Sequence, residues 1–147
     1  MLVIAFAFIT FIFFIEIFSS NFNSLVGLVR ESNNMEGKVI EYFNAWNTHS
    51  GDAVAACFTH DGMLRDWDIE VHGAEEVGAA NGKIFSAVPN IKIEVLRIHT
   101  SEITLTATAE ILVHLNDESE TVLKVADVIA FNSIAELKIK SVVAYKG

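Results

Sequence analysis

One acidic residue, Asp127, interrupts an apolar run and restricts how this part of the chain can fold. Residues 123–131 read LKVADVIAF, and such a run, rich in β-branched residues, is typical of a strand. Side chains alternate along a strand, so Val125, Asp127 and Ile129 share one face and Lys124 occupies the other. The pattern therefore predicts a sheet whose apolar face carries a carboxyl group that Lys124 cannot easily neutralise.

A carboxyl group in an apolar setting either finds hydrogen-bond partners or raises its pKa and stays protonated. A protonated acid in a pocket can donate a hydrogen bond to a developing oxyanion, which makes Asp127 a candidate for chemistry. The alternative is a structural acid satisfied by a nearby hydroxyl or backbone amide, because perturbed acids also occur in structural networks.

The chain before this strand has the periodicity of helices. Apolar residues at helical spacing predict an amphipathic helix over 35–47, and Asp52 is a natural N-cap for a short second helix that includes Cys57 and Phe58. Asp61 and Gly62 indicate a turn before an extended segment over 63–71. A third helix is expected over 73–87, weakened by its two glycines.

The chain after Pro89 is predicted to be β-structure, with strands over 91–98, 103–115, 123–131 and 137–145. Helices followed by consecutive antiparallel strands define the α+β class. We expect a curved antiparallel sheet wrapped by three N-terminal helices, with an internal pocket in the concavity between them.

Composition excludes several classes of function. The chain has 147 residues, a formal net charge of −9 and a single cysteine, Cys57. The negative charge argues against nucleic-acid binding, and one cysteine allows neither an internal disulfide nor a cysteine-based zinc site. The histidines lack the spacing of metal ligands, and no phosphate-binding or nucleotide motif is present. We therefore expect no metal and no cofactor.

The N-terminal segment is more hydrophobic than the rest of the chain. Residues 1–18 form a hydrophobic leader or anchor, residues 19–34 a polar linker, and residues 35–147 the domain. The leader matches the core of a signal peptide better than a membrane span, although no basic residue precedes it. It predicts a secreted or membrane-anchored protein, with an unrelated upstream extension and a cytoplasmic protein as the alternatives.

The residues from 35 onward resemble a known family. The segments YFNAWN at 42–47, FTHDG at 58–62 and ADVIAF at 126–131 are similar, in order and spacing, to those of the ketosteroid isomerases. Those enzymes belong with the SnoaL-like polyketide cyclases to the nuclear-transport-factor-like superfamily. The resemblance implies a cone-shaped α+β fold that opens between helices and sheet and often forms a homodimer through the outer surface of the sheet.

The resemblance also implies a site, carried over position by position. Tyr42, Asp66 and Asp127 fall at the positions of the tyrosine and two aspartates of the isomerases. Asp66 would be the base, with Tyr42 and protonated Asp127 as donors to an enolate oxygen. The pocket lining would be formed by Trp46, Phe58, Trp67 and Asn81. Asp66 is followed by Trp67 where the isomerases usually have proline, and Asn81 replaces a tyrosine, so the resemblance does not extend to a steroid substrate.

Each of these residues also has a structural interpretation. Tyr42 could be a core aromatic beside Trp46, Asp66 a solvated acid, and Trp67 either a pocket wall or a dimer contact. The expected function is a cofactor-independent isomerase, or a related cyclase or lyase, that abstracts a proton beside a carbonyl of an apolar small molecule. The alternative is a non-catalytic ligand-binding or dimerisation domain of the same fold.

Overall fold

A computed structural model of the protein describes residues 34–147. Residues 35–147 form one compact unit. The predicted leader and almost all of the predicted linker lie outside the described residues, so export or anchoring stays a prediction. Among the described helices, none is long and apolar enough to cross a membrane.

Three helices precede most of the sheet. Helix α2 spans Met35–Asn47, α3 spans Gly51–Ala55 and α4 spans Ala74–Ala87. The strands are β1 (Phe58–Arg65), β2 (Glu70–His72), β3 (Lys92–Ser101), β4 (Thr106–His114), β5 (Val122–Phe131) and β6 (Ile139–Lys146). Helices and strands thus follow the predicted order, and the α+β class is confirmed.

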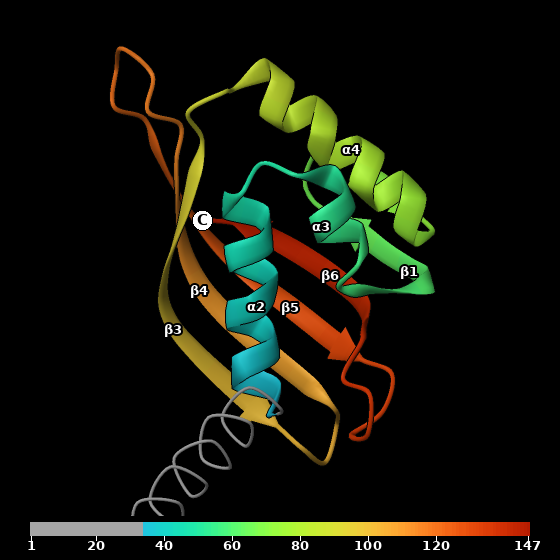
Figure 1. The fold of residues 1–147 in the computed structure, drawn as a ribbon. Coiled ribbons are helices and arrows are strands. Elements are labelled where there is room, and N and C mark those ends of the chain that lie inside the picture. The colour runs from blue at the N-terminus through green and yellow to red at the C-terminus, as the bar shows by residue number, and fades with distance from the viewer. Residues whose placement is uncertain (1–33) are drawn as a thin grey trace, which may run out of the picture. The chain divides into compact units, whose positions relative to one another are not determined.

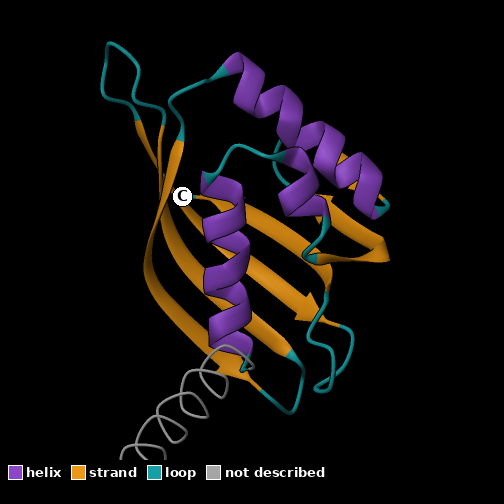
Figure 2. Cartoon of the chain, viewed as in Figure 1, coloured by secondary structure: helices purple, strands orange, loops and turns teal. Residues whose placement is uncertain are grey.

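The six strands form one curved, open sheet in the order β2-β1-β6-β5-β4-β3 (Figures 1 and 2). Every neighbouring pair is antiparallel except β1 and β6, which run parallel. Helix α2 packs against β3 and β4, and α4 packs against β1 and β2. The helices therefore approach the sheet most closely toward its two edges and bridge the central strands β5 and β6 between them.

The face of the sheet that the helices cover is apolar, as alternation requires. On β5 the buried residues are Val125, Asp127, Ile129 and Phe131, while Lys124 is exposed on the opposite face. On β4 the alanine and aliphatic residues at 107, 109, 111 and 113 are buried in the same way. The predicted placement of Asp127 on the apolar face of a strand is confirmed, and this strand lies in the middle of the sheet.

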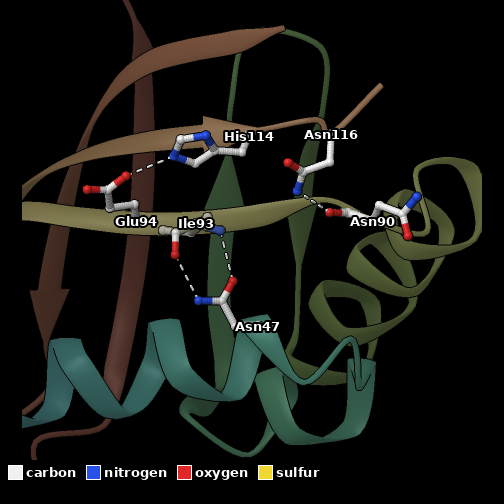
Figure 3. A network of polar contacts seen from close by, with 6 residues as sticks. All are labelled: Asn47, Asn90, Ile93, Glu94, His114 and Asn116. Carbon is white, nitrogen blue, oxygen red and sulfur yellow. Dashed lines mark hydrogen bonds and ion pairs between the residues drawn. The ribbon is translucent and has the colours of Figure 1, made fainter. Parts of the chain in front are cut away.

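The end of α2 is fixed to the edge strand β3 by the side-chain amide of Asn47. Asn47 bonds Ile93 in both directions, donating Nδ2–H to its carbonyl at 2.8 Å and accepting from its amide at 2.8 Å (Figure 3). Nearby, Asn116 donates to the carbonyl of Asn90 at 2.6 Å. The two bonds of Asn47 satisfy edge groups of β3 that would otherwise lack a strand partner, which also discourages pairing with another chain.

The structure differs from the prediction around the second helix. The helix ends at Ala55, and Phe58 begins β1 instead of closing the helix. Its N-cap is Ser50, whose hydroxyl accepts from the amide of Ala53 at 3.2 Å, and not the predicted Asp52. Asp61 and Gly62 lie within β1, where the pairing with β6 shifts register, rather than in a turn. An irregular strand start interrupts alternation, so its sequence resembles a helix end followed by a loop.

Helices α3 and α4 approach each other closely at two glycines, Gly51 of α3 and Gly78 of α4. A Cβ on Gly78 would lie 2.8 Å from the carbonyl oxygen of Gly51 and 3.0 Å from Cβ of Ala55. Gly82, one turn later on α4, has nothing within 4 Å of its Cβ position. The close approach at Gly78 therefore needs the absence of a side chain, whereas Gly82 only lowers helix propensity.

This contrast predicts opposite effects of the same substitution. Gly78→Ala should lower the free energy of unfolding by about 1–3 kcal/mol, because the helices must move apart. Gly82→Ala should raise it by up to about 1 kcal/mol, through helix propensity alone. Urea denaturation of both variants and the parent measures the two effects. Equal effects of the two substitutions would contradict this account of the helix crossing.

Candidate active site

Asp127 lies at the centre of the covered face with small residues on both sides. The strand register pairs it with Ala109 of β4 and with Ala144 of β6. The residue is 5% exposed, and its Oδ1 has no hydrogen-bond partner within residues 34–147. The methyl groups of these two alanines leave more room above the carboxyl group than larger side chains would. The carboxyl group is therefore shielded from water, but its partners on the neighbouring strands do not cover it.

Burial controls the ionisation of this acid. Loss of hydration raises the pKa of Asp127 from 3.8 to about 7, and the negative charge of Asp66 contributes in the same direction. A carboxyl group with this pKa is substantially protonated near neutral pH. It can then donate a hydrogen bond, which an ordinary aspartate cannot.

Tyr42 faces the same region from α2. Its side chain is 3% exposed, and its ring meets Phe43 and Phe58 at centroid distances of 4.9 and 5.8 Å. Burial raises its pKa well above 10.0, with further contributions from the charges of Asp127 and Cys57. Its hydroxyl takes part in no hydrogen bond within residues 34–147. Tyr42 is therefore a neutral phenol, and its O–H group is available as a hydrogen-bond donor.

Asp66 immediately follows β1 and is half-buried. Its Oδ1 accepts hydrogen bonds from the amides of Asp68 and Ile69, both at 2.7 Å, which fix the carboxylate in a turn. Because Leu64 pairs with Val142, continuing that register sets Asp66 beside Ala144. Asp66 and Asp127 then flank Ala144, about 10 Å apart in the backbone from two strand spacings.

Three of the four predicted lining residues lie in the core. Trp46 donates from Nε1 to Oδ1 of Asn81 at 2.7 Å, and Asn81 donates to the carbonyl of Val77 at 2.8 Å. Trp46 and Asn81 are 6% and 1% exposed, so this network joins α2 to α4 within the core. Phe58 packs edge-on against Tyr42. The role of these residues in lining a substrate pocket stays a prediction.

Trp67, by contrast, is 44% exposed. The ammonium group of Lys146 lies over its ring, 5.4 Å from the centroid. Trp67 follows Asp66 in the chain, and its role in lining a substrate pocket stays a prediction. The contact of Lys146 with Trp67 was not predicted, although the position of Lys146 two residues after Ala144 on β6 could have indicated that the two β6 residues share a face.

Two hollows on the described unit lie elsewhere. The larger, about 400 Å³, is lined by α3 and α4 around Gly51 and Gly78. The smaller, about 30 Å³, lies around Cys57 and Lys138. Neither is lined by Tyr42, Asp66 or Asp127, so an internal pocket at these three residues stays a prediction.

A sequence profile described as a SnoaL-like domain matches residues 39–141. No functionally curated protein matches the chain in sequence. Solved structures share the fold at low identity. A protein with a ketosteroid isomerase-like fold from Catenulispora acidiphila, in complex with trimethylamine, is 16% identical with a TM-score of 0.65, covering 74% of this chain and 83% of its own.

Two further structures extend the comparison. A SnoaL-like protein of unknown function from Burkholderia thailandensis is 15% identical, with a TM-score of 0.64 over 76% of this chain and 93% of its own. SalBIII, an epoxide hydrolase/cyclase-like enzyme in pyran ring formation in salinomycin, is 19% identical, with a TM-score of 0.59 over 77% and 90%. These likenesses show the nuclear-transport-factor-like fold, as expected from the sequence.

The raised pKa of Asp127 predicts a pH-dependent stability. The folded protein holds a proton up to about pH 7 that the unfolded chain releases near pH 3.8, so stability falls as pH rises through this interval. The loss is at most about 4 kcal/mol, since one pKa unit corresponds to about 1.4 kcal/mol. Asp127→Asn should therefore be more stable than the parent at pH 8, and this advantage should shrink toward pH 4.

Urea denaturation of parent and variant at several pH values measures this difference. Asp68→Asn, which removes a charge from an exposed position, serves as the control and should show little of the trend. An Asp127→Asn advantage that stays constant from pH 4 to 8 would show that Asp127 is ionised in the folded protein.

Proposed function

Because the chain belongs to the SnoaL-like domain family, we propose that it is a cofactor-independent enzyme that abstracts a proton beside a carbonyl group of a mostly apolar small molecule. The observation that carries the proposal is the buried Asp127 carboxyl, with a pKa of about 7 and an oxygen that accepts no hydrogen bond from any described residue. A group of this kind is costly to keep unless a ligand uses it.

The proposed reaction divides the chemistry among three side chains. The carboxylate of Asp66 takes a proton from the carbon next to the substrate carbonyl. The electrons of that C–H bond move to the carbonyl oxygen, which becomes an enolate. Tyr42 and protonated Asp127 donate hydrogen bonds to this oxygen, where negative charge develops.

The geometry supports this division of roles. The two amide bonds to Oδ1 of Asp66 hold the base in place and leave its Oδ2 outside those bonds. Asp127 is drier than Asp66, and the charge of Asp66 itself favours the protonated form of Asp127. The more hydrated acid, Asp66, is therefore assigned as the base, and the more buried acid, Asp127, as the hydrogen-bond donor.

The fate of the enolate decides the reaction type. Return of the proton to another carbon gives an isomerase, whereas attack of the enolate on an electrophile within the same molecule closes a ring. The similarity to SalBIII, a cyclase-like enzyme, supports keeping cyclisation beside isomerisation. In either case the substrate must be largely apolar, because the residues around Asp127 are aliphatic and aromatic.

Substituted phenols test the donors, since a phenolate mimics the enolate. We expect binding to tighten as the phenol becomes more acidic, and Tyr42→Phe or Asp127→Asn to weaken it by about 100-fold or more. A non-catalytic binding domain should instead respond only to the size of the phenol. Titration can be followed by tryptophan fluorescence.

Asp66→Asn tests the base separately. Isomerisation of a small β,γ-unsaturated ketone should fall by at least about 100-fold, while phenol binding is retained. Asp68→Asn, the neighbouring exposed acid, is the matched control and should keep the parent rate. Full activity of Asp66→Asn would overturn the assignment of the base.

We further propose that the protein is a homodimer through the outer face of the sheet. The central strands present Ala126 and Val128 of β5 beside Tyr145 and Val143 of β6 on this face. Val128 and Tyr145 are 37% and 55% exposed, which is a large apolar exposure for the middle of a sheet.

A charge on this face should disrupt the dimer. Val128→Lys is expected to convert the dimer to a monomer, because burying an unpaired ammonium in an apolar interface is unfavourable. Ile103→Lys, at a 98% exposed position in the β3–β4 connection, is the control and should leave the mass unchanged. Light scattering after size exclusion measures both; a dimeric Val128→Lys protein would place the interface elsewhere.

A further inference from the structure

Lys146 has an aromatic ring as its partner, a contact that no other lysine or arginine of residues 34–147 makes. Its ammonium group lies over the ring of Trp67, 5.4 Å from the centroid, and it takes part in no ion pair within residues 34–147. Arg97 and Lys38, by comparison, pair with the carboxylates of Glu110 and Glu41. The charge of Lys146 is therefore held in position by an aromatic ring and not neutralised by an acid.

The register places this cation on the face that carries the candidate site. Lys146 pairs with Val125, which is buried on the inner face of β5, and it lies two residues beyond Ala144 on β6. One strand spacing across and two residues along separate Lys146 from Asp127, about 8 Å in the backbone. The Lys146 side chain is exposed, so it lies at the solvent end of a face whose centre is dry.

The charges around Lys146 limit what it can bind. Asp66 and Asp68 flank Trp67 in the chain, and the protein carries a net charge of −9. A single ammonium in an acidic surrounding can balance one negative charge, whereas a doubly charged group would meet uncompensated repulsion. The contact with Trp67 also restricts the lysine before any ligand arrives, which lowers the entropic cost of binding.

We propose that Lys146, supported by Trp67, is a specificity-determining residue that binds a carboxylate at the outer end of the substrate. This inference rests on the proposed function and names its substrate class: an apolar keto acid, with its ketone at Tyr42 and Asp127 and its carboxylate at Lys146. The substrate would thus be amphiphilic, in keeping with the change from a buried to an exposed surface along the site.

A pair of phenols tests the inference. 4-Hydroxyphenylacetate carries a carboxylate, and 4-hydroxyphenylacetamide is its neutral counterpart of nearly equal phenol acidity, because a methylene group separates each substituent from the ring. Both are titrated against the parent, Lys146→Gln, Lys146→Arg and Lys124→Gln. Lys124 is the matched control, since it neighbours Val125 but points to the opposite face of the sheet.

We expect the parent to bind the carboxylate about fivefold more tightly than the amide, the size of a favourable pair near the surface. Lys146→Gln should abolish that preference, Lys146→Arg should keep it, and Lys124→Gln should leave it unchanged. The preference should also weaken in high salt, because the pair is exposed.

The other outcomes separate the two proposals. If both phenols bind through Tyr42 and Asp127 but the parent shows no preference, or Lys146→Gln retains one, the role of Lys146 is overturned and the proposed function stands. If neither phenol binds to any of the proteins, the proposed function fails and the inference fails with it.

Discussion

The cost of burying the Asp127 carboxyl is the constraint on which the site depends. A carboxylate transferred to an apolar environment loses its hydration, and the protein avoids most of this cost by keeping the group protonated. The pKa of about 7 expresses that compromise. It persists only while the sheet stays curved around its apolar face and the helices bridge the strands on which Asp127 and Ala144 lie.

The rest of the fold holds those conditions in place. Asn47 fixes the end of α2 to the edge strand β3, and the Trp46–Asn81 hydrogen bond joins α2 to α4. The absence of a side chain at Gly78 lets α3 approach α4 closely. With α2 over one edge of the sheet and α4 over the other, Asp127 lies beneath the region between them, and its partners on both neighbouring strands are alanines.

Strand alternation made Asp127 predictable, since a period of two fixes the face of every residue in a regular strand. The fold class followed from the order of helical and alternating segments. The prediction for Phe58 was wrong because β1 begins irregularly. The parallel pairing of β1 with β6 could not be predicted, because it leaves no local pattern in the sequence of either strand. The contact of Trp67 with Lys146 joins residues 79 positions apart. Only the register of the folded sheet brings them together.

Two buried polar side chains of residues 34–147 differ in how their burial is compensated. Asn81 uses its carbonyl for Trp46 and its amide for Val77, so its burial is compensated and its role in the core is complete. Asp127 is buried to a similar degree, but its Oδ1 has no hydrogen-bond partner in the described part of the chain. A structural acid should have acquired one, because a hydroxyl in place of Ala109 or Ala144 could reach it. The chain instead surrounds the carboxyl with methyl groups, which is the arrangement expected when its hydrogen bond is reserved for a ligand.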